Sequence, residues 1–338
     1  MRGSRIINIF IKYFLIFIGL TIFLFLAYKF VPENILKNDF PGSSINVLGL
    51  NENDFFQYFY FLYALITCKV GYVNTLFYSG SVKSSISLIL PETIVFLVIT
   101  FPISYVISYI IGFYSGTAFR IIRRLSMNIF PLLFLYLVSG LTLLTVFSGV
   151  LGWLPFSGIL SGRSIIVNNW ISYTGNGIFV TTPTNIIIID SIIHHSNGTL
   201  LDYLKHMALP FMALVIPTTI YLSVYISHET SVEYNRSYMR AGITRDAFRD
   251  NYILYIKRGI RPRILNELKP VFLIFVGGMV LTSFIFSYMN LGEFAVYSFL
   301  NYDFGFMGGL YSLFILSIII IIFDLIIDII NVEARHEN

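Results

Sequence analysis

The stretch LYSLFILSIIIIIFDLIIDII, residues 310–330, decides the fold class of this chain. It is almost wholly apolar and has the length of roughly 20 residues that a helix needs to cross the ~30 Å hydrocarbon core of a bilayer. Its apolar residues are continuous and do not alternate with polar ones, which favours a helix over a barrel strand. A helix also closes its backbone hydrogen bonds within one segment, as lipid requires. The stretch therefore predicts a transmembrane helix.

Five further stretches have the same character, so we expect an all-α membrane protein with about six transmembrane helices: 6–30, 86–112, 127–151, 207–226 and 271–288. Composition agrees, because 56% of the 338 residues are hydrophobic and only 12% are charged, against roughly 25% charged residues in a soluble domain. The lipid bilayer is the expected surrounding, and no nucleic-acid partner is expected. The single cysteine, Cys68, excludes an internal disulfide.

Positive charge predicts the orientation. Most of the 22 Lys and Arg residues fall in 1–5, 116–125, 229–263 and 332–338, whereas 31–85, 152–205 and 291–308 hold few. Because loops rich in Lys and Arg stay in the cytoplasm, we expect both termini to be cytoplasmic. The first apolar stretch is longer than the roughly 7–15 residues of a signal-peptide core, so we expect it to remain as a helix.

These features predict a domain order. Residues 1–30 form the first transmembrane helix, 31–85 an extracellular segment, and 86–338 the core with helices two to six. Within that core, 152–205 is an extracellular insert and 229–263 a cytoplasmic loop. Both outside segments contain apolar runs that are too hydrophobic to stay solvated, so we expect them to form one external cap.

The cytoplasmic loop 229–263 is longer than a connector between two helices needs to be. Its residues 233–243 predict a short helix that Gly242 ends, followed by a second start at Thr244. Spacing alone leaves two interpretations open. The loop is either a docking element or a solvated, basic loop that only orients the protein.

Residues 233–243, EYNRSYMRAGI, resemble the EAA loop of ABC importer permeases in its dipeptide/oligopeptide form. The segments 151–158, 206–210, 277–278, 290–292 and 302–303 resemble further blocks of that family in the same order. The departures are Tyr238 and Arg240 where the family has alanines, Ser283 in place of an acidic residue, and Asn331-Val332 in place of Asp-Pro. The resemblance indicates a divergent member.

The resemblance implies an ATPase-coupling loop made by Glu233, Tyr234, Arg236, Ser237, Tyr238, Arg240, Ala241, Gly242 and Ile243. It also implies half of a translocation pathway in the plasma membrane, for a peptide or another small solute, with an oligosaccharide as an alternative. No Walker-type glycine loop occurs in the sequence. ATP and Mg would therefore act in nucleotide-binding partner subunits, beside a second permease subunit and an extracellular solute-binding protein. This chain itself is expected to be no enzyme and to bind no cofactor.

Other ionisable residues carry weaker expectations. Glu92, at the outer start of the second helix, is a candidate for lining the solute pathway. Asp190, His194 and His195 resemble zinc ligands but lack a third histidine at the usual spacing, so no metal site is expected. Lys12 is expected to reach the interface as a snorkelling lysine. The last helix carries Asp324 and Asp328 on one face, which would meet the loop, a partner or solvent.

Two other functions would need features that we do not find. A membrane-embedded hydrolase needs a nucleophile and a base that meet inside the bilayer, and the spans carry almost no histidine. A secondary transporter needs ion-coupling acids near the midplane and often an inverted repeat.

Overall fold

The computed structural model describes residues 2–40, 48–50, 52–75, 78–118, 129, 131–173, 179–239, 252–301, 303 and 305–334. Within them, six helical segments are long and apolar enough to cross a membrane: Ile6–Lys29, Val82–Gly116, Pro131–Val150, Asn197–Tyr234, Ile253–Phe286 and Phe306–Val332. The prediction of six spanning helices is confirmed on length and composition. Which side of a membrane the termini face stays a prediction.

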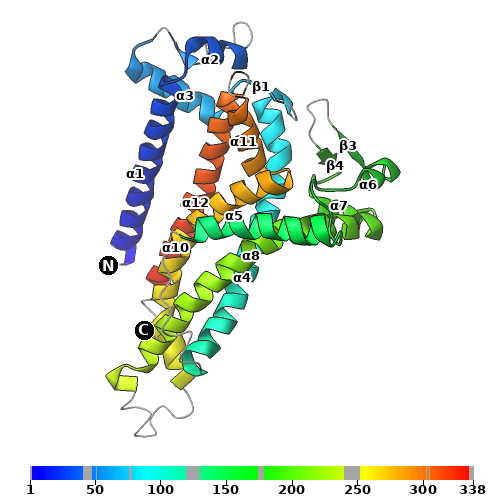
Figure 1. The fold of residues 1–338 in the computed structure, drawn as a ribbon. Helices are drawn as coiled ribbons and strands as arrows, with labels where there is room; N and C mark the ends of the chain where they lie inside the picture. The colour runs from blue at the N-terminus through cyan, green and yellow to red at the C-terminus, as the bar shows by residue number, and fades with distance from the viewer. Residues whose placement is uncertain are drawn as a thin grey trace.

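The bundle consists of α1 (Arg2–Lys29), α4 (Val82–Ala118), α5 (Pro131–Leu143), α8 (Asn197–Tyr234), α10 (Tyr252–Phe286) and α12 (Phe306–Ala334). A π-helical turn, η3 (Leu144–Val150), continues α5. Figure 1 shows α5 running across the bundle, steeply inclined to α1 and α12. The central helix is α8. In its most apolar stretch of 18 residues, 67% is buried inside the protein, against 17% in the corresponding stretch of α12.

Helices α4, α8 and α10 extend well beyond the predicted spans, to 37, 38 and 35 residues. The predicted helix start at residue 207 is therefore wrong, because α8 begins at Asn197. Hydropathy marks only the apolar part of a helix, whereas the hydrogen-bonded backbone continues through polar residues. Each of these three helices also contains two prolines, and proline in a helix interior removes a hydrogen bond and favours a kink.

Two glycines allow α4 to approach α8 closely. A Cβ on Gly112 would lie 2.7 Å from the carbonyl oxygen of Ser223, and one on Gly116 would lie 2.7 Å from that of Ser227. No side chain fits at such distances, so glycine is required at both positions. The pair forms a Gly-x-x-x-Gly motif, which is typical of tightly packed transmembrane helices.

The two predicted extracellular segments fold into two separate lobes (Figure 1). The first lobe holds α2 (Glu33–Asp39), α3 (Asp54–Ile66) and the antiparallel pair β1 (Tyr72–Asn74) and β2 (Ser79–Ser81). The second holds α6 (Gly162–Val167), the antiparallel pair β3 (Ile171–Tyr173) and β4 (Phe179–Thr181), α7 (Ile187–Ile193) and the start of α8. The short helix α11 (Leu291–Leu300) connects α10 to α12. The two lobes contact different parts of the bundle, and their joint role as one external cap stays a prediction.

Side chains fasten each lobe to the bundle. Tyr28 at the end of α1 stacks on Phe61 of α3 with ring centroids 5.1 Å apart, and Gln57 donates to the Tyr28 hydroxyl at 3.2 Å. In the second lobe, the Asn185 amide donates to the backbone carbonyl of Leu88 in α4. These aromatic and amide contacts hold each lobe in a defined position against the helices.

Candidate functional site

The candidate site lies at the end of the α8 and α10 pair, far from α2 and α3 (Figure 1). Glu233 and Tyr234 form the last residues of α8, and the chain turns at Asn235, whose amide donates to the Ser231 carbonyl at 2.7 Å. Residues 237–239 are helical again. The predicted single helix over 233–243 is therefore interrupted at its start. Glu233 belongs to the end of α8, and a new helical segment begins at residue 237. Arg240, Ala241, Gly242 and Ile243 lie outside the described residues.

The Glu233 side chain is the centre of this site and is 1% exposed. Its carboxylate accepts hydrogen bonds from the Tyr238 hydroxyl and from Arg263 Nη2 of α10. Arg236 Nε lies 3.2 Å from Glu233 Oε2 as well. A buried carboxylate is stable only when paired and hydrogen-bonded, and these three donors meet that need.

Arg263 ties the two helices together. Its Nε lies 3.0 Å from Glu229 Oε2 on α8, and its Nη2 donates to the Gly259 carbonyl at 3.2 Å. Gly259 leaves room for the acid, because a Cβ there would lie 2.5 Å from Glu233 Cδ. The guanidinium thus holds two carboxylates one helical turn apart, an arrangement that arginine's planar fork favours.

The segment after the turn folds back against the bundle. Met239 is fully buried, as are Ile256 and Ile260 of α10, and all three belong to the same apolar core. The outer side of the site stays open, since Tyr234 and Tyr238 are 37% and 45% exposed. Burial and the hydrogen bond to Glu233 raise the pKa of Tyr238, so the hydroxyl keeps its proton and remains a donor.

Five of the nine residues assigned to the loop from sequence are therefore described, and two of them, Arg236 and Tyr238, contact Glu233. Their role in coupling to an ATPase stays a prediction. Arg263 and Gly259 were missed. The available signal was a spacing of four residues between Gly259 and Arg263, which places both on one helix face.

Glu92 lies elsewhere in the bundle, in a buried network of its own. It is 3% exposed, and one of its oxygens accepts from the hydroxyls of Tyr203 on α8 and Tyr288 beyond α10. The two hydroxyls are 2.8 Å apart. The network joins α4, α8 and the residues that follow the C-terminal end of α10. A role of Glu92 in the solute pathway stays a prediction.

A second charged cluster includes Lys12. Its ammonium lies 3.1 Å from Asp328 Oδ2 of α12, and Lys269 of α10 contacts the other oxygen of the same carboxylate. The Tyr13 hydroxyl donates to Asp328 at 2.7 Å. Lys12 thus pairs with a residue of another helix, and its position relative to the membrane interface stays a prediction. Opposite charges on separate spans were the sequence signal for this cluster.

The residues weighed as zinc ligands have other roles in the second lobe. Asp190 accepts from the Thr181 and Thr184 hydroxyls at 2.5 and 2.7 Å. The His194 ring stacks on Trp170 with centroids 4.9 Å apart. In the described ranges, no group of three His, Cys, Asp or Glu side chains is placed to hold a metal ion.

Comparison with known proteins found two relatives. The chain is 24% identical to the di/tripeptide transport system permease protein DppB of Pseudomonas aeruginosa over 218 residues, 59% of this chain and 56% of that protein. It is 22% identical to the peptide transport system permease protein SapB of Salmonella typhimurium over 263 residues, 75% of this chain and 76% of that protein. No family model matches the chain. The match with the first relative thus spans little more than half of that protein's length. Together with the six apolar helices, the two relatives support a place for this chain in the dipeptide/oligopeptide permease family, as a divergent member.

Proposed function

We propose that this chain is the transmembrane permease subunit of an ABC importer, in which it forms half of the translocation pathway for a small solute. Both relatives carry names of peptide transport permeases, so a peptide is the favoured solute. The chain would lie in the plasma membrane as a multi-pass protein. Six apolar helices support this placement.

The proposed partners rest on the likeness to the two transport-system permeases. The sequence itself contains no Walker-type glycine loop. Two nucleotide-binding subunits would hydrolyse ATP with Mg, and a second permease subunit would complete the pathway. An extracellular binding protein would deliver the solute. This chain would contribute binding surfaces and moving helices, but no chemistry.

The observation that carries the proposal is the set of ion pairs that Arg263 makes with Glu233 and Glu229, which we call the Glu233 clamp. It joins the ends of α8 and α10 through Arg263 and leaves Tyr234, Arg236 and Tyr238 at the surface. A nucleotide-binding subunit that docks on this surface would move α8 and α10 together. Because α8 is the most buried span, its displacement would reach the centre of the bundle, as in a rigid-body transition between two states.

Affinity purification from native membranes tests the proposal. The tagged chain should copurify with an ATPase that contains a Walker motif and with a second permease, and solute should stimulate ATP hydrolysis by the complex. Recovery of the chain without any ATPase, together with uptake that depends only on an ion gradient, would refute it.

A further inference from the structure

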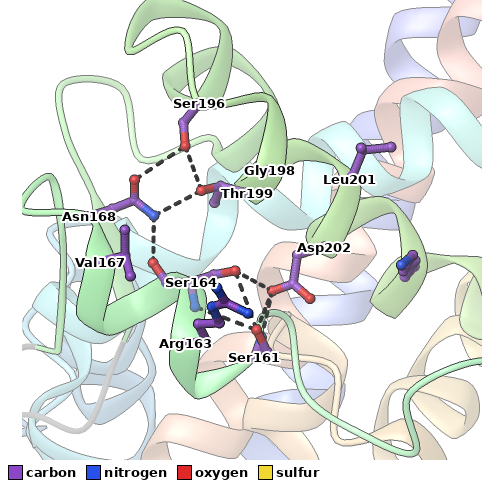
Figure 2. A pocket seen from close by; sticks show the side chains of 11 residues that line it. Ser161, Arg163, Ser164, Val167, Asn168, Ser196, Gly198, Thr199, Leu201 and Asp202 are labelled. Atoms are coloured by element: carbon purple, nitrogen blue, oxygen red, sulfur yellow. Dashed lines mark hydrogen bonds between the residues drawn. The ribbon is translucent and has the colours of Figure 1, made fainter.

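A polar pocket of about 480 Å³ lies in the second lobe, between α6 and the first turns of α8. Figure 2 labels Arg163, Asn168 and Asp202 in its lining. Lys205 lines the pocket as well, and these four are its residues with charged or amide groups. The volume falls within the roughly 300–1,000 Å³ range of pockets that hold small ligands. The residues of the Glu233 and Glu92 sites do not line this pocket.

The inner wall of the pocket is held rigid by hydrogen bonds. Asp202 Oδ2 accepts from the Ser161 amide at 2.8 Å, the Ser161 hydroxyl at 2.8 Å and the Ser164 hydroxyl at 2.7 Å. Asn168 donates to the Ser164 carbonyl at 2.6 Å and to the Thr199 hydroxyl at 2.9 Å (Figure 2). A wall with fixed side chains loses little conformational entropy when a ligand binds.

The second oxygen of Asp202 is free for a ligand. All three donors bind Oδ2, and within the described part of the chain Asp202 Oδ1 has no hydrogen bond. His206 Nδ1 lies 3.6 Å from this Oδ1, beyond hydrogen-bond distance, and donates to the Asp202 backbone carbonyl at 2.9 Å. A carboxylate oxygen in this position can accept from an ammonium group.

Positive charge lines the same pocket. Arg163 and Lys205 are both exposed, and among the described residues neither forms an ion pair. Arginine presents a planar set of donors that matches a carboxylate, and lysine adds a point charge. The pocket thus offers partners for an anion and for a cation at the same time.

We propose that this pocket binds a small zwitterionic ligand, with its carboxylate at Arg163 and Lys205 and its ammonium at Asp202 Oδ1. A free amino acid or a short unblocked peptide has this chemistry. The choice of a peptide as the ligand rests on the proposed function, whereas the place of the site rests on the pocket alone. Binding to the purified chain needs no ATPase, so it can fail while copurification succeeds, and the reverse can also occur.

Calorimetric titration of the full chain in lipid nanodiscs tests the proposal, with the dipeptide Ala-Ala as the probe. Ala-Ala should bind saturably, whereas N-acetyl-Ala-Ala and Ala-Ala-amide should each bind about tenfold or more weakly, because each lacks one charged group. The blocked peptides test both contacts without changing the protein. Arg163→Gln and Asp202→Asn should weaken Ala-Ala binding by a similar factor.

Lys83→Gln is the matched control, because Lys83 is an exposed cation that does not line the pocket. It should bind Ala-Ala like the unaltered chain. Absence of saturable binding would overturn the proposal. So would equal affinity for the three peptides, or loss of binding with the amide alone, which would indicate a simple anion site.

Discussion

Replacing Glu233 by glutamine tests whether the clamp holds α8 to α10. Glutamine keeps the size of the side chain and one acceptor oxygen, but it removes the charge that faces Arg263 and Arg236. A buried hydrogen bond to a charged group contributes ~1.5–3 kcal/mol. The pair with Arg236, whose side chain is 50% exposed, adds only about 0–1 kcal/mol.

Arg263 would not be left alone, because Glu229 lies 3.0 Å from its Nε. The cost should therefore stay below the ~3–5 kcal/mol of an orphaned buried charge. We expect Glu233→Gln to lower the free energy of unfolding by about 2–3 kcal/mol. Reversible unfolding of the purified chain in mixed micelles measures this change.

A double-mutant cycle with Arg263→Gln isolates the pair, and its coupling energy should be about 1–2 kcal/mol. Glu33→Gln is the control, because Glu33 pairs with Lys37 at 3.6 Å with both side chains more than 60% exposed. It should change stability by less than about 0.5 kcal/mol. The reasoning is refuted if Glu233→Gln behaves like Glu33→Gln, or if the two clamp substitutions are additive.

The other predictions concern separate parts of the chain. Gly242→Trp should weaken recovery of the ATPase in a pull-down, because a bulky group would clash with a closely docked partner; full assembly and coupled uptake would contradict the docking role. Lys269→Met should destabilise the chain by ~1–3 kcal/mol in the same unfolding assay, because Asp328 loses one of its partners inside the bundle; unchanged stability would show that the pair contributes nothing. Burial raises the pKa of Asp39 from 3.8 to about 7, so folding favours its protonated form, and stability should fall as pH rises from about 4 through 7. Asp39→Asn should remove that fall, and identical pH profiles would refute the assignment. Asn197→Cys in a chain without its native thiol should react with a membrane-impermeant maleimide added outside, and labelling from the cytoplasm alone would overturn the predicted topology.

The sequence by itself determined the spanning helices. Hydropathy is a property of each segment alone, so the run 310–330 already predicts the helix observed at Phe306–Ala334. The same reasoning placed helix ends poorly, as the start of α8 at Asn197 shows, because polar residues continue a helix beyond the apolar part. A resemblance of local sequence also predicts a coupling role for Glu233 and its neighbours, and that role stays a prediction.

Only the tertiary structure decided which of these residues meet. Lys12 and Asp328 are separated by 316 positions, and Glu233 and Arg263 by 30. Whether such pairs form depends on the rotation and crossing of whole helices, which the approach at Gly112 and Gly116 helps to set. The division of the outer segments into two lobes, and the pocket around Asp202, likewise arise from contacts between distant segments. A pattern within one segment does not determine these contacts, because packing is a property of pairs of surfaces.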